Sequence, residues 1–391
     1  MLVLVLSVGA RLAWTYLSPY GSEFVDLHVY VGGAATIGTG QSLYDYVYSY
    51  RTADFPLPFV YPPFAALAFY PLHFLPFGLV GLLWQLAIFA ALYASVRVSQ
   101  ALMAPIAGPG APSTALLWTA VGVWIEPVRA NLDFGQINVM LMLAILCAAQ
   151  SSRWWWSGIL VGVAAGIKMT PAVSGLYFVG MRRWATVVCS AVVFAGTVAL
   201  SAVVLGEGVR YYFTRLIGAA GRTFPIGSAT NQSWYGCVSR ILGHDAGFAW
   251  PVIAGVVASA MIAVLAWRAT DPRDRLGRLV IVMVFGLLVS PVSWTHHWVW
   301  LLPMTMWLVH GAAREWPAAR IVGWGWLVMI VVGPPWLLAL VQHSQWQISR
   351  PWYLAWAALA YVAAAVATMG WVAVTGRRSR RSPSPARSPS P

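Results

Sequence analysis

The sequence predicts an all-α polytopic membrane protein. Hydrophobic residues make up 60% of the 391 residues and charged residues only 9%, and the mean hydropathy is +0.70. Soluble domains carry about 25% charged residues, so this composition excludes an ordinary soluble domain. Apolar runs long enough for the roughly 30 Å of a bilayer's hydrocarbon recur along almost the whole chain. The 23 Trp and 16 Tyr suit a protein with many helix ends at the headgroup level.

Counting the apolar runs predicts about twelve transmembrane helices. In chain order we expect them at 1–17, 61–76, 78–102, 113–126, 137–150, 154–179, 184–206, 246–267, 279–293, 297–312, 318–341 and 351–375. The first, which contains Arg11, is interpreted as a retained helix because no basic segment and no A-x-A site mark a cleaved signal peptide. Such an anchor usually carries flanking positive charge, which leaves open whether Met1 is the native start.

Basic residues set the predicted orientation. The net charge of +13 would suggest a nucleic-acid partner for a soluble protein, but the excess of Arg in cytoplasmic loops explains it here. Arg182–Arg183, the loop 268–278 and the cluster 377–381 all lie between or after apolar runs. Placing them in the cytoplasm puts both termini inside. Loops 18–60 and 207–245 then share the outer, periplasmic face of the plasma membrane.

One run leaves the topology open. The segment 61–76 is short and contains Pro62, Pro63, Pro71 and Pro76, so it could be re-entrant rather than spanning. We favour a full crossing. A re-entrant segment would move the turn between Glu126 and Asn138 from the cytoplasmic to the external side.

Two segments are predicted to lie outside the hydrocarbon. Residues 24–37 indicate a short interfacial helix in the first external loop, which Gly38 and Gly40 can end with left-handed backbone. Residues 377–391 are rich in Arg, Ser and Pro and predict a disordered cytoplasmic tail after the transmembrane domain 1–376.

The first external loop holds the most informative pattern. Asp26 lies in Phe24-Val-Asp-Leu-His-Val-Tyr30, and Phe59-Val-Tyr-Pro-Pro-Phe64, with Tyr61, follows. The chain has only 11 acidic residues, and a carboxylate near hydrocarbon is costly unless it is functional. A helix cap or a solvated loop acid is the structural alternative for Asp26.

Three further patterns carry polar side chains. Ser290-Pro-Val-Ser-Trp-Thr-His-His-Trp298 places His296 and His297 about 100° apart on a helix, which disfavours joint metal binding. Thr230-Asn-Gln-Ser-Trp-Tyr-Gly236, with Arg240, lies in the second external loop, which also contains Arg210, Arg215 and Arg222. The fourth pattern comprises Glu126, Arg129, Gln136, Asn138 and Lys168. The side of the membrane on which it lies depends on whether 61–76 crosses.

Together these ordered strings resemble the GT-C glycosyltransferases, and specifically the polyprenol-phosphate-mannose-dependent α-(1→2)-mannosyltransferases of family 87. The resemblance implies a GT-C-like helical bundle in which Asp26 is the general base and Tyr61 shapes the mouth of the cavity. It assigns His296 and His297 to the donor phosphate, Asn231 and Gln232 to sugar hydroxyls, and Arg240 to a lipid phosphate. No cofactor and no metal ion are expected.

The implied substrates are polyprenyl-phosphate mannose and a mannosylated lipid. Whether the acceptor is a phosphatidylinositol mannoside or a lipomannan or arabinomannan, and which oligomeric state forms, stay open. One carboxylate suffices for an inverting transfer, because a lipid-phosphate donor already has a good leaving group and only the acceptor hydroxyl needs a base. A lipid or solute transporter is the alternative, but it would place acids near the bilayer midplane, whereas all 11 fall in predicted loops or at helix ends.

Overall fold

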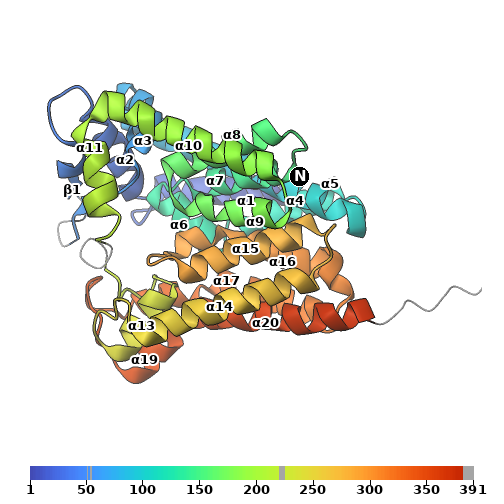
Figure 1. Cartoon of the computed structure of the whole chain (residues 1–391). Helices are drawn as coiled ribbons and strands as arrows, with labels where there is room; N and C mark the ends of the chain where they lie inside the picture. Colours follow the sequence, from blue (N-terminus) through green and yellow to red (C-terminus); the bar gives the residue numbers. More distant parts are fainter. Residues whose placement is uncertain (51, 53–54, 220–224, 382–391) are drawn as a thin grey trace, which may run out of the picture.

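The computed structural model describes residues 1–391 except 51, 53–54, 220–224 and 382–391, and the described chain is mostly helical (Figure 1). Its only named strands, β1 (Val47–Tyr48) and β2 (Leu57–Pro58), pair antiparallel with Tyr48 opposite Leu57. The prediction of an all-α protein is confirmed.

Helices of ten residues or more form the body of the molecule. They are α1 (Leu2–Leu17), α2 (Val25–Ala35), α4 (Phe77–Ala107), α5 (Pro112–Gly122), α7 (Asn138–Gln150), α8 (Trp154–Ile167), α10 (Trp184–Leu205), α14 (Trp250–Ala269), α15 (Arg275–Val289), α16 (Leu301–His310), α17 (Ala319–Val332) and α20 (Ala360–Arg381).

Shorter helices connect them. These are α3 (Pro63–Phe69), α6 (Glu126–Phe134), α9 (Ser174–Gly180), α11 (Glu207–Tyr211), α13 (Trp234–Leu242), α18 (Pro334–Ala339) and α19 (Trp352–Ala357). Short 3₁₀-helices are η1 (Leu43–Asp45), η2 (Tyr70–Phe74), η3 (Thr170–Val173), η5 (Thr295–Trp300) and η6 (Ala312–Glu315), and η4 (Tyr212–Leu216) is a π-helical turn.

The long helices lie side by side, and their connections collect at two ends. In Figure 1, α2, α3, α11, α13 and α19 occupy the left end, called the site end below, whereas the N-terminus and the end of α20 lie toward the right. The two long loops that we predict to be external, 18–60 and 207–245, meet at the site end, where the rings of Tyr44 and Tyr211 are 5.5 Å apart.

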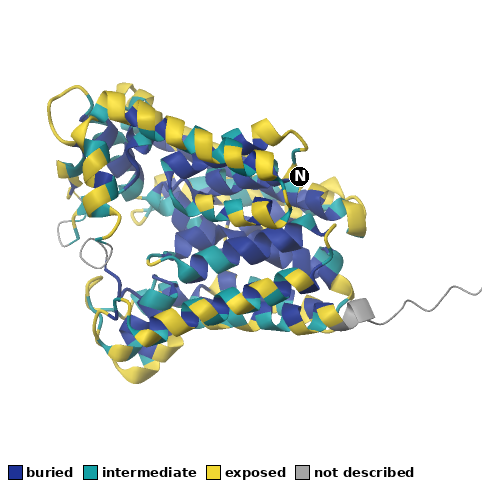
Figure 2. Ribbon diagram, in the orientation of Figure 1, coloured by how far each residue is buried: buried dark blue, intermediate teal, exposed yellow. Residues whose placement is uncertain are grey.

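Apolar surface on the outer helices indicates a membrane protein. Four described helical segments are long and apolar enough to cross a bilayer: α4, α10, α14 and the stretch Ala319–Ala339 that joins α17 to α18. α10 and α14 expose apolar side chains at helical spacing, as the yellow stretches of Figure 2 show; these are Val188, Val192, Leu200 and Val203 on α10 and Ile253, Val257, Met261 and Val264 on α14. Such stripes suit contact with lipid.

The favoured crossing over 61–76 is wrong. Pro62 precedes α3 and Pro63 begins it, while Pro71 falls in η2 and Pro76 precedes α4. α3 has 7 residues, a length of about 10 Å, which cannot cross about 30 Å of hydrocarbon. The prolines, which interrupt the helix, therefore decide the structure of this segment despite its apolar composition.

The predicted helix 154–179 is also interrupted. α8 ends at Ile167, and Lys168 adopts extended backbone with φ −150°. The single turn η3 and the short helix α9 follow. One predicted crossing is thus two shorter helical segments, and the break between them carries a lysine.

Close packing of α8 on α10 fixes the position of that break. Gly158, Gly162 and Gly166 recur every fourth residue of α8, and a Cβ on each would lie 2.5–2.6 Å from Cys189, Val193 and Thr197 of α10. Small residues at this spacing let two membrane helices approach closely. Because each later glycine of α8 contacts a later residue of α10, the two helices run parallel.

Gly162→Ala is expected to destabilise the protein by about 1–3 kcal/mol, because the added methyl overpacks the contact with Val193. Gly196→Ala on α10 is the matched control, since nothing lies within 4 Å of its Cβ position. Ala is the better helix former, so the control should match or exceed the wild type in stability. Thermal unfolding in detergent measures both. Equal midpoints for the two variants would contradict the close packing.

The C-terminal helix ends later than predicted, and the expected run 351–375 is divided into α19 and α20. α20 continues to Arg381, so the tail expected from residue 377 begins within a helix. The rest of that predicted tail, 382–391, lies outside the described residues.

Candidate active site

Four segments that carry three of the sequence patterns converge at the site end. α2 carries Asp26, the turn between α6 and α7 carries Gln136, the break after α8 carries Lys168, and η5 carries His296 and His297. Hydrogen bonds join each segment to another of the set. The turn between α6 and α7 therefore lies on the same side as α2. This is the topology in which 61–76 is re-entrant, not the favoured full crossing.

The start of α2 is fixed on α6. The Phe24 N–H donates to the Asp133 carbonyl at 2.9 Å, and the Asp133 carboxylate accepts from Ser22 at 3.0 Å. Arg11, which is 1% exposed, forms an ion pair with the same carboxylate. The charge that interrupts the first apolar run thus anchors the loop that carries Asp26.

A glycine lets α2 approach the next turn. Gly135 ends α6 with φ +71°, and a Cβ on it would lie 2.5 Å from the Cβ of Leu27. Glycine meets both demands, the left-handed backbone and the close approach. The side chain of Gln136, the next residue, is thereby brought against α2.

Gln136 and Lys168 are the centre of a buried polar network. Gln136 Oε1 accepts from Tyr30 Oη at 2.9 Å and from Lys168 Nζ at 3.2 Å, and Gln136 Nε2 donates to Tyr61 Oη at 3.1 Å. Lys168 Nζ also donates to Asn138 Oδ1 at 2.9 Å and lies 5.2 Å from the centre of the Tyr61 ring. Both hydrogen bonds of the amine therefore go to neutral amide oxygens.

Asp26 lies beside this network and is half-buried. Gln136 donates a hydrogen bond to it, and Lys168 lies within electrostatic range. Burial raises the pKa of Asp26 to about 6, although the hydrogen bond and the positive charge oppose the rise. A carboxylate with this pKa is ionised at neutral pH and more basic than a solvated one, as a general base requires.

The histidine pair lies within electrostatic range of Lys168. Asn131 of α6 donates to the His296 carbonyl at 2.8 Å, and the His296 and His297 ring centres are 4.7 Å apart. Within the described residues, His296 Nε2 and His297 Nδ1 have no hydrogen-bond partner. Burial lowers the pKa of His296, in η5, well below its usual range, and Lys168 adds to this effect. His296 is therefore neutral. Burial lowers the pKa of Lys168 to about 7, and Asp26 opposes the fall, so the amine is partly protonated at neutral pH and is the cation within electrostatic range of both Asp26 and the histidine pair.

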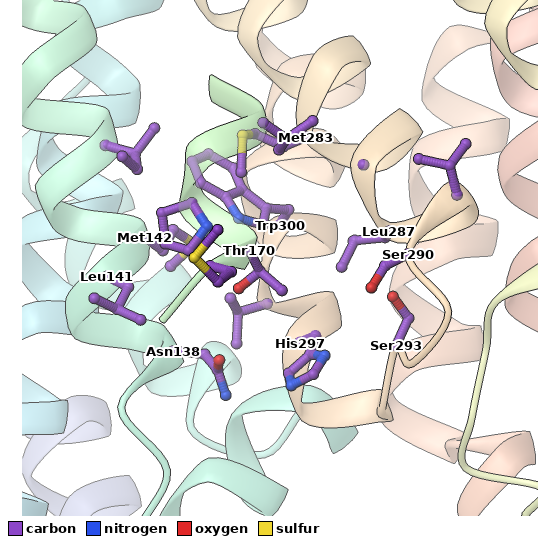
Figure 3. Close-up of a pocket in the computed structure, with 17 residues that line it drawn as sticks. Asn138, Leu141, Met142, Thr170, Met283, Leu287, Ser290, Ser293, His297 and Trp300 are labelled. Atoms are coloured by element: carbon purple, nitrogen blue, oxygen red, sulfur yellow. The ribbon is translucent and has the colours of Figure 1, made fainter. Parts of the chain in front are cut away.

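A cavity of about 250 Å³ opens from this region into the bundle. Asn138 and His297 lie near each other at one end (Figure 3), and the remaining wall is largely apolar. It includes Leu141, Met142, Ile145, Met283, Leu287 and Trp300. A polar end beside Lys168 and an apolar interior suit an amphiphilic ligand.

Asn231 and Gln232 direct their amides into the protein. Asn231 Oδ1 accepts from the Ser293 N–H at 2.9 Å, and Gln232 Nε2 donates to the carbonyls of Ala229 at 2.7 Å and Ala358 at 2.8 Å. These bonds hold the second external loop to the segment before the histidines. The side-chain amides thus form hydrogen bonds with backbone N–H and C=O groups that no helix or strand pairs.

Arg240 is likewise turned inward. It is 1% exposed and donates to the carbonyls of Ser228 at 2.7 Å, Asn231 at 2.8 Å and Ala358 at 2.9 Å. Its guanidinium organises the loop, so the expected contact with a lipid phosphate has no accessible group to make it. Arg222 of the same loop lies outside the described residues.

Sequence reasoning did not single out Tyr30, and it left Glu126, Gln136 and Lys168 without a role. Glu126 is 1% exposed and accepts from Tyr361 Oη at 3.1 Å, which ties α6 to α20. The motifs that resemble the family contain Glu126, Gln136 and Lys168, and they were the only indication in the sequence that these residues belong to the site. The missing information was on which side of the membrane they lie.

Comparison with known proteins identifies the family of the chain. The model of glycosyltransferase family 87 matches residues 59–291. A Mycobacterium tuberculosis (strain CDC 1551 / Oshkosh) protein called polyprenol-phosphate-mannose-dependent alpha-(1-2)-phosphatidylinositol pentamannoside mannosyltransferase is 60% identical over 98% of this chain and 89% of its own. Its namesake from Mycolicibacterium smegmatis is 58% identical over 97% and 92%.

A third relative is more distant. The polyprenol-phosphate-mannose-dependent alpha-(1-2)-phosphatidylinositol mannoside mannosyltransferase of Mycobacterium tuberculosis (strain ATCC 25618 / H37Rv) is 31% identical over 72% of this chain and 69% of its own. No solved structure matches the chain significantly. The ordered motifs, their convergence and these matches lead to one conclusion: the chain belongs to glycosyltransferase family 87.

Proposed function

We propose that this protein transfers mannose from polyprenyl-phosphate mannose to a phosphatidylinositol mannoside, forming an α-(1→2) bond. The names and coverage of the relatives support this substrate pair. The observation that carries the proposal is the location of Asp26, half-buried and bonded by Gln136, within electrostatic range of Lys168. A base and a cation side by side suit a reaction in which a hydroxyl loses a proton while a phosphate leaves.

In the proposed reaction, Asp26 accepts the proton of the acceptor's 2-hydroxyl as that oxygen attacks the anomeric carbon. The bond from this carbon to the phosphate oxygen breaks, and the electron pair leaves with the polyprenyl phosphate. Attack from the opposite face converts the β-linked donor into an α-linked product. One carboxylate suffices, since no glycosyl-enzyme intermediate forms.

Lys168 is the proposed partner of the donor phosphate. An ammonium has three donors, and the described residues use two of them, so the third can reach a phosphate oxygen. His296 and His297 would donate neutral hydrogen bonds to the same group. The prenyl chain would enter the apolar cavity behind Asn138 and His297, while Tyr61 forms the wall opposite Lys168.

We place the site end at the periplasmic face, with both termini in the cytoplasm. The broken segment 61–76 would not cross, and the run 154–179 would supply two passes through α8 and the segment η3–α9, so the total stays at about twelve. Arg183 and Arg275 bond the last turn of α7, at the opposite end from Asn138. Cytoplasmic loops carry an excess of Arg, which favours the cytoplasm for this end.

Purified protein, supplied with polyprenyl-phosphate mannose and a panel of mannosylated phosphatidylinositols, tests the proposal. We expect one mannose to be transferred per acceptor, with release of polyprenyl phosphate and an α-(1→2) linkage in the product. Lipomannan and arabinomannan acceptors should react poorly. Direct use of GDP-mannose would overturn the donor assignment.

Transfer is expected to persist in excess EDTA. Lys168 and the histidine pair can neutralise a monoanionic phosphodiester, and in the described chain no three His, Cys, Asp or Glu side chains form a group that could hold a metal ion. Initial rates before and after chelation give the answer. Complete inhibition that a divalent ion reverses would contradict this mechanism.

The pH profile should reveal the environment of Asp26. Its pKa of about 6 means that the base is lost as the pH falls through 6, so kcat/KM should decline about tenfold per unit below that value. It should also decline above about pH 7, where Lys168 loses its charge. Steady-state rates between pH 4.5 and about 8, with unfolding monitored in parallel, test this. An acid limb centred near pH 4, as for a solvated Asp, would contradict the buried setting.

A further inference from the structure

A second cavity, of about 510 Å³, opens at the site end between the first and second external loops. The 42–45 segment forms one wall and the α11–η4 segment the other. The lining includes Ser42, Tyr44, Asp45, Tyr211, Thr214 and Arg215. We call this cavity the outer cavity. Its volume lies within the roughly 300–1,000 Å³ of small-molecule sites.

Tyrosine rings form a platform at its wall. The Tyr44 ring lies 5.5 Å from that of Tyr211 at an interplanar angle of 31° and 6.0 Å from that of Tyr212 at 24°. Tyr211 remains 47% exposed, so ring surface is available to a ligand. Aromatic faces pack on the C–H face of a pyranose, and nearby hydroxyl, carboxylate and guanidinium groups bond its hydroxyls.

The charges in the outer cavity are balanced. Arg210 and Arg215 face Asp45 and Glu207, and Arg210 approaches Glu207 at 4.0 Å. Two positive and two negative groups give no net attraction for an anion. The lining therefore favours a neutral, hydroxyl-rich ligand over a lipid phosphate.

A direct contact links the outer cavity to the reaction site. Tyr44 Oη donates to the carbonyl of Tyr61 at 3.0 Å, and Tyr61 Oη accepts from Gln136 at 3.1 Å. The outer cavity is thus one layer of residues away from the network beside Asp26. A chain of sugars whose terminal residue reaches Asp26 can extend into this space.

We propose that the outer cavity binds mannosyl residues of the acceptor that precede the reacting one. The inference rests on the proposed function, and the donor cannot supply this ligand because polyprenyl-phosphate mannose has a single sugar. Tyr211 stacks on a sugar ring, while Asp45 and Thr214 bond its hydroxyls. This subsite makes the enzyme prefer acceptors with several mannoses.

Kinetics with a long and a short acceptor test the inference. Tyr211→Ala and Asp45→Ala should each raise KM for a phosphatidylinositol pentamannoside about tenfold, the equivalent of roughly 1.4 kcal/mol. KM for a phosphatidylinositol monomannoside, KM for the donor and kcat should stay within about twofold, since neither residue contacts the reacting atoms. Tyr20→Ala, at another exposed tyrosine, is the matched control and should change nothing. Equal effects on both acceptors, or none on either, would overturn the subsite.

A binding measurement separates this inference from the proposed function. Saturation-transfer NMR with a free mannose oligosaccharide needs no turnover. Wild type and Tyr20→Ala should give a signal that Tyr211→Ala loses. Loss of this difference overturns the subsite even if transfer is observed, whereas its presence supports a sugar-binding outer cavity even if no transfer is detected.

Discussion

Replacing Asp26 by Asn is expected to lower kcat by about 10²–10⁴-fold, the range for removal of a general base. Asn keeps the size of the side chain and removes only its basicity. Because the start of α2 is held through Phe24, Ser22 and Asp133 rather than through Asp26, the fold should be preserved. Single-turnover transfer from polyprenyl-phosphate mannose measures the loss.

Donor binding supplies the control for this variant. The Kd for polyprenyl-phosphate mannose should remain within a few-fold of the wild-type value, which shows that the site is assembled. Turnover within about threefold of wild type would place the base elsewhere, with Glu23 as the next candidate in the same loop.

Replacing Lys168 by Met is expected to lower kcat by about 10²–10³-fold, the usual cost of removing one group that stabilises developing charge. The leaving phosphate would lose its proposed cationic partner. Met retains much of the length and apolar volume of the side chain, so packing against the Tyr61 ring should be largely kept. Pre-steady-state rates at saturating donor isolate the chemical step.

The pH profile distinguishes an electrostatic role of Lys168 from a structural one. Lys168 lowers the pKa of Asp26, so its removal should raise that pKa and move the acid limb to higher pH. Lys168→Arg keeps the charge and should leave the limb near its wild-type position. A limb that does not move in Lys168→Met would rule out the electrostatic role.

Local patterns predicted the first external loop well. The helix expected at 24–37 is α2, Val25–Ala35, and Gly38 and Gly40 both have φ +82°. Short-range rules place this helix because local residues, the two glycines among them, mark where it lies, whereas its packing on α6 comes from contacts between segments far apart in the chain.

Hydropathy alone misplaced the breaks. Apolar composition predicted a crossing over 61–76, where prolines end each short helix, and a single helix over 154–179, where the chain is extended at Lys168. Both breaks lie against the site, and membrane proteins tolerate irregular backbone where it borders a polar cavity. The side of the membrane on which Gln136 and Lys168 lie depends on the number of crossings before them, and no local pattern predicts that number.

The external loop residues show a different limit. Asn231, Gln232 and Arg240 have the side chains that bind sugars and phosphates, yet the same donors and acceptors also satisfy loop backbone. The structure uses them for that purpose. The sequence carries no sign of which use applies.

A structure of Asp26→Asn with polyprenyl-phosphate mannose and a phosphatidylinositol mannoside bound tests the central claim most directly, namely that Asp26, Lys168 and the histidine pair form one sugar-transfer site. We predict the acceptor's 2-hydroxyl between residue 26 and the anomeric carbon, about 3–3.5 Å from that carbon. The donor phosphate should lie within hydrogen-bond distance of Lys168 Nζ, about 2.7–3.2 Å. A phosphate bound away from Lys168, or an acceptor hydroxyl out of reach of residue 26, would contradict the account.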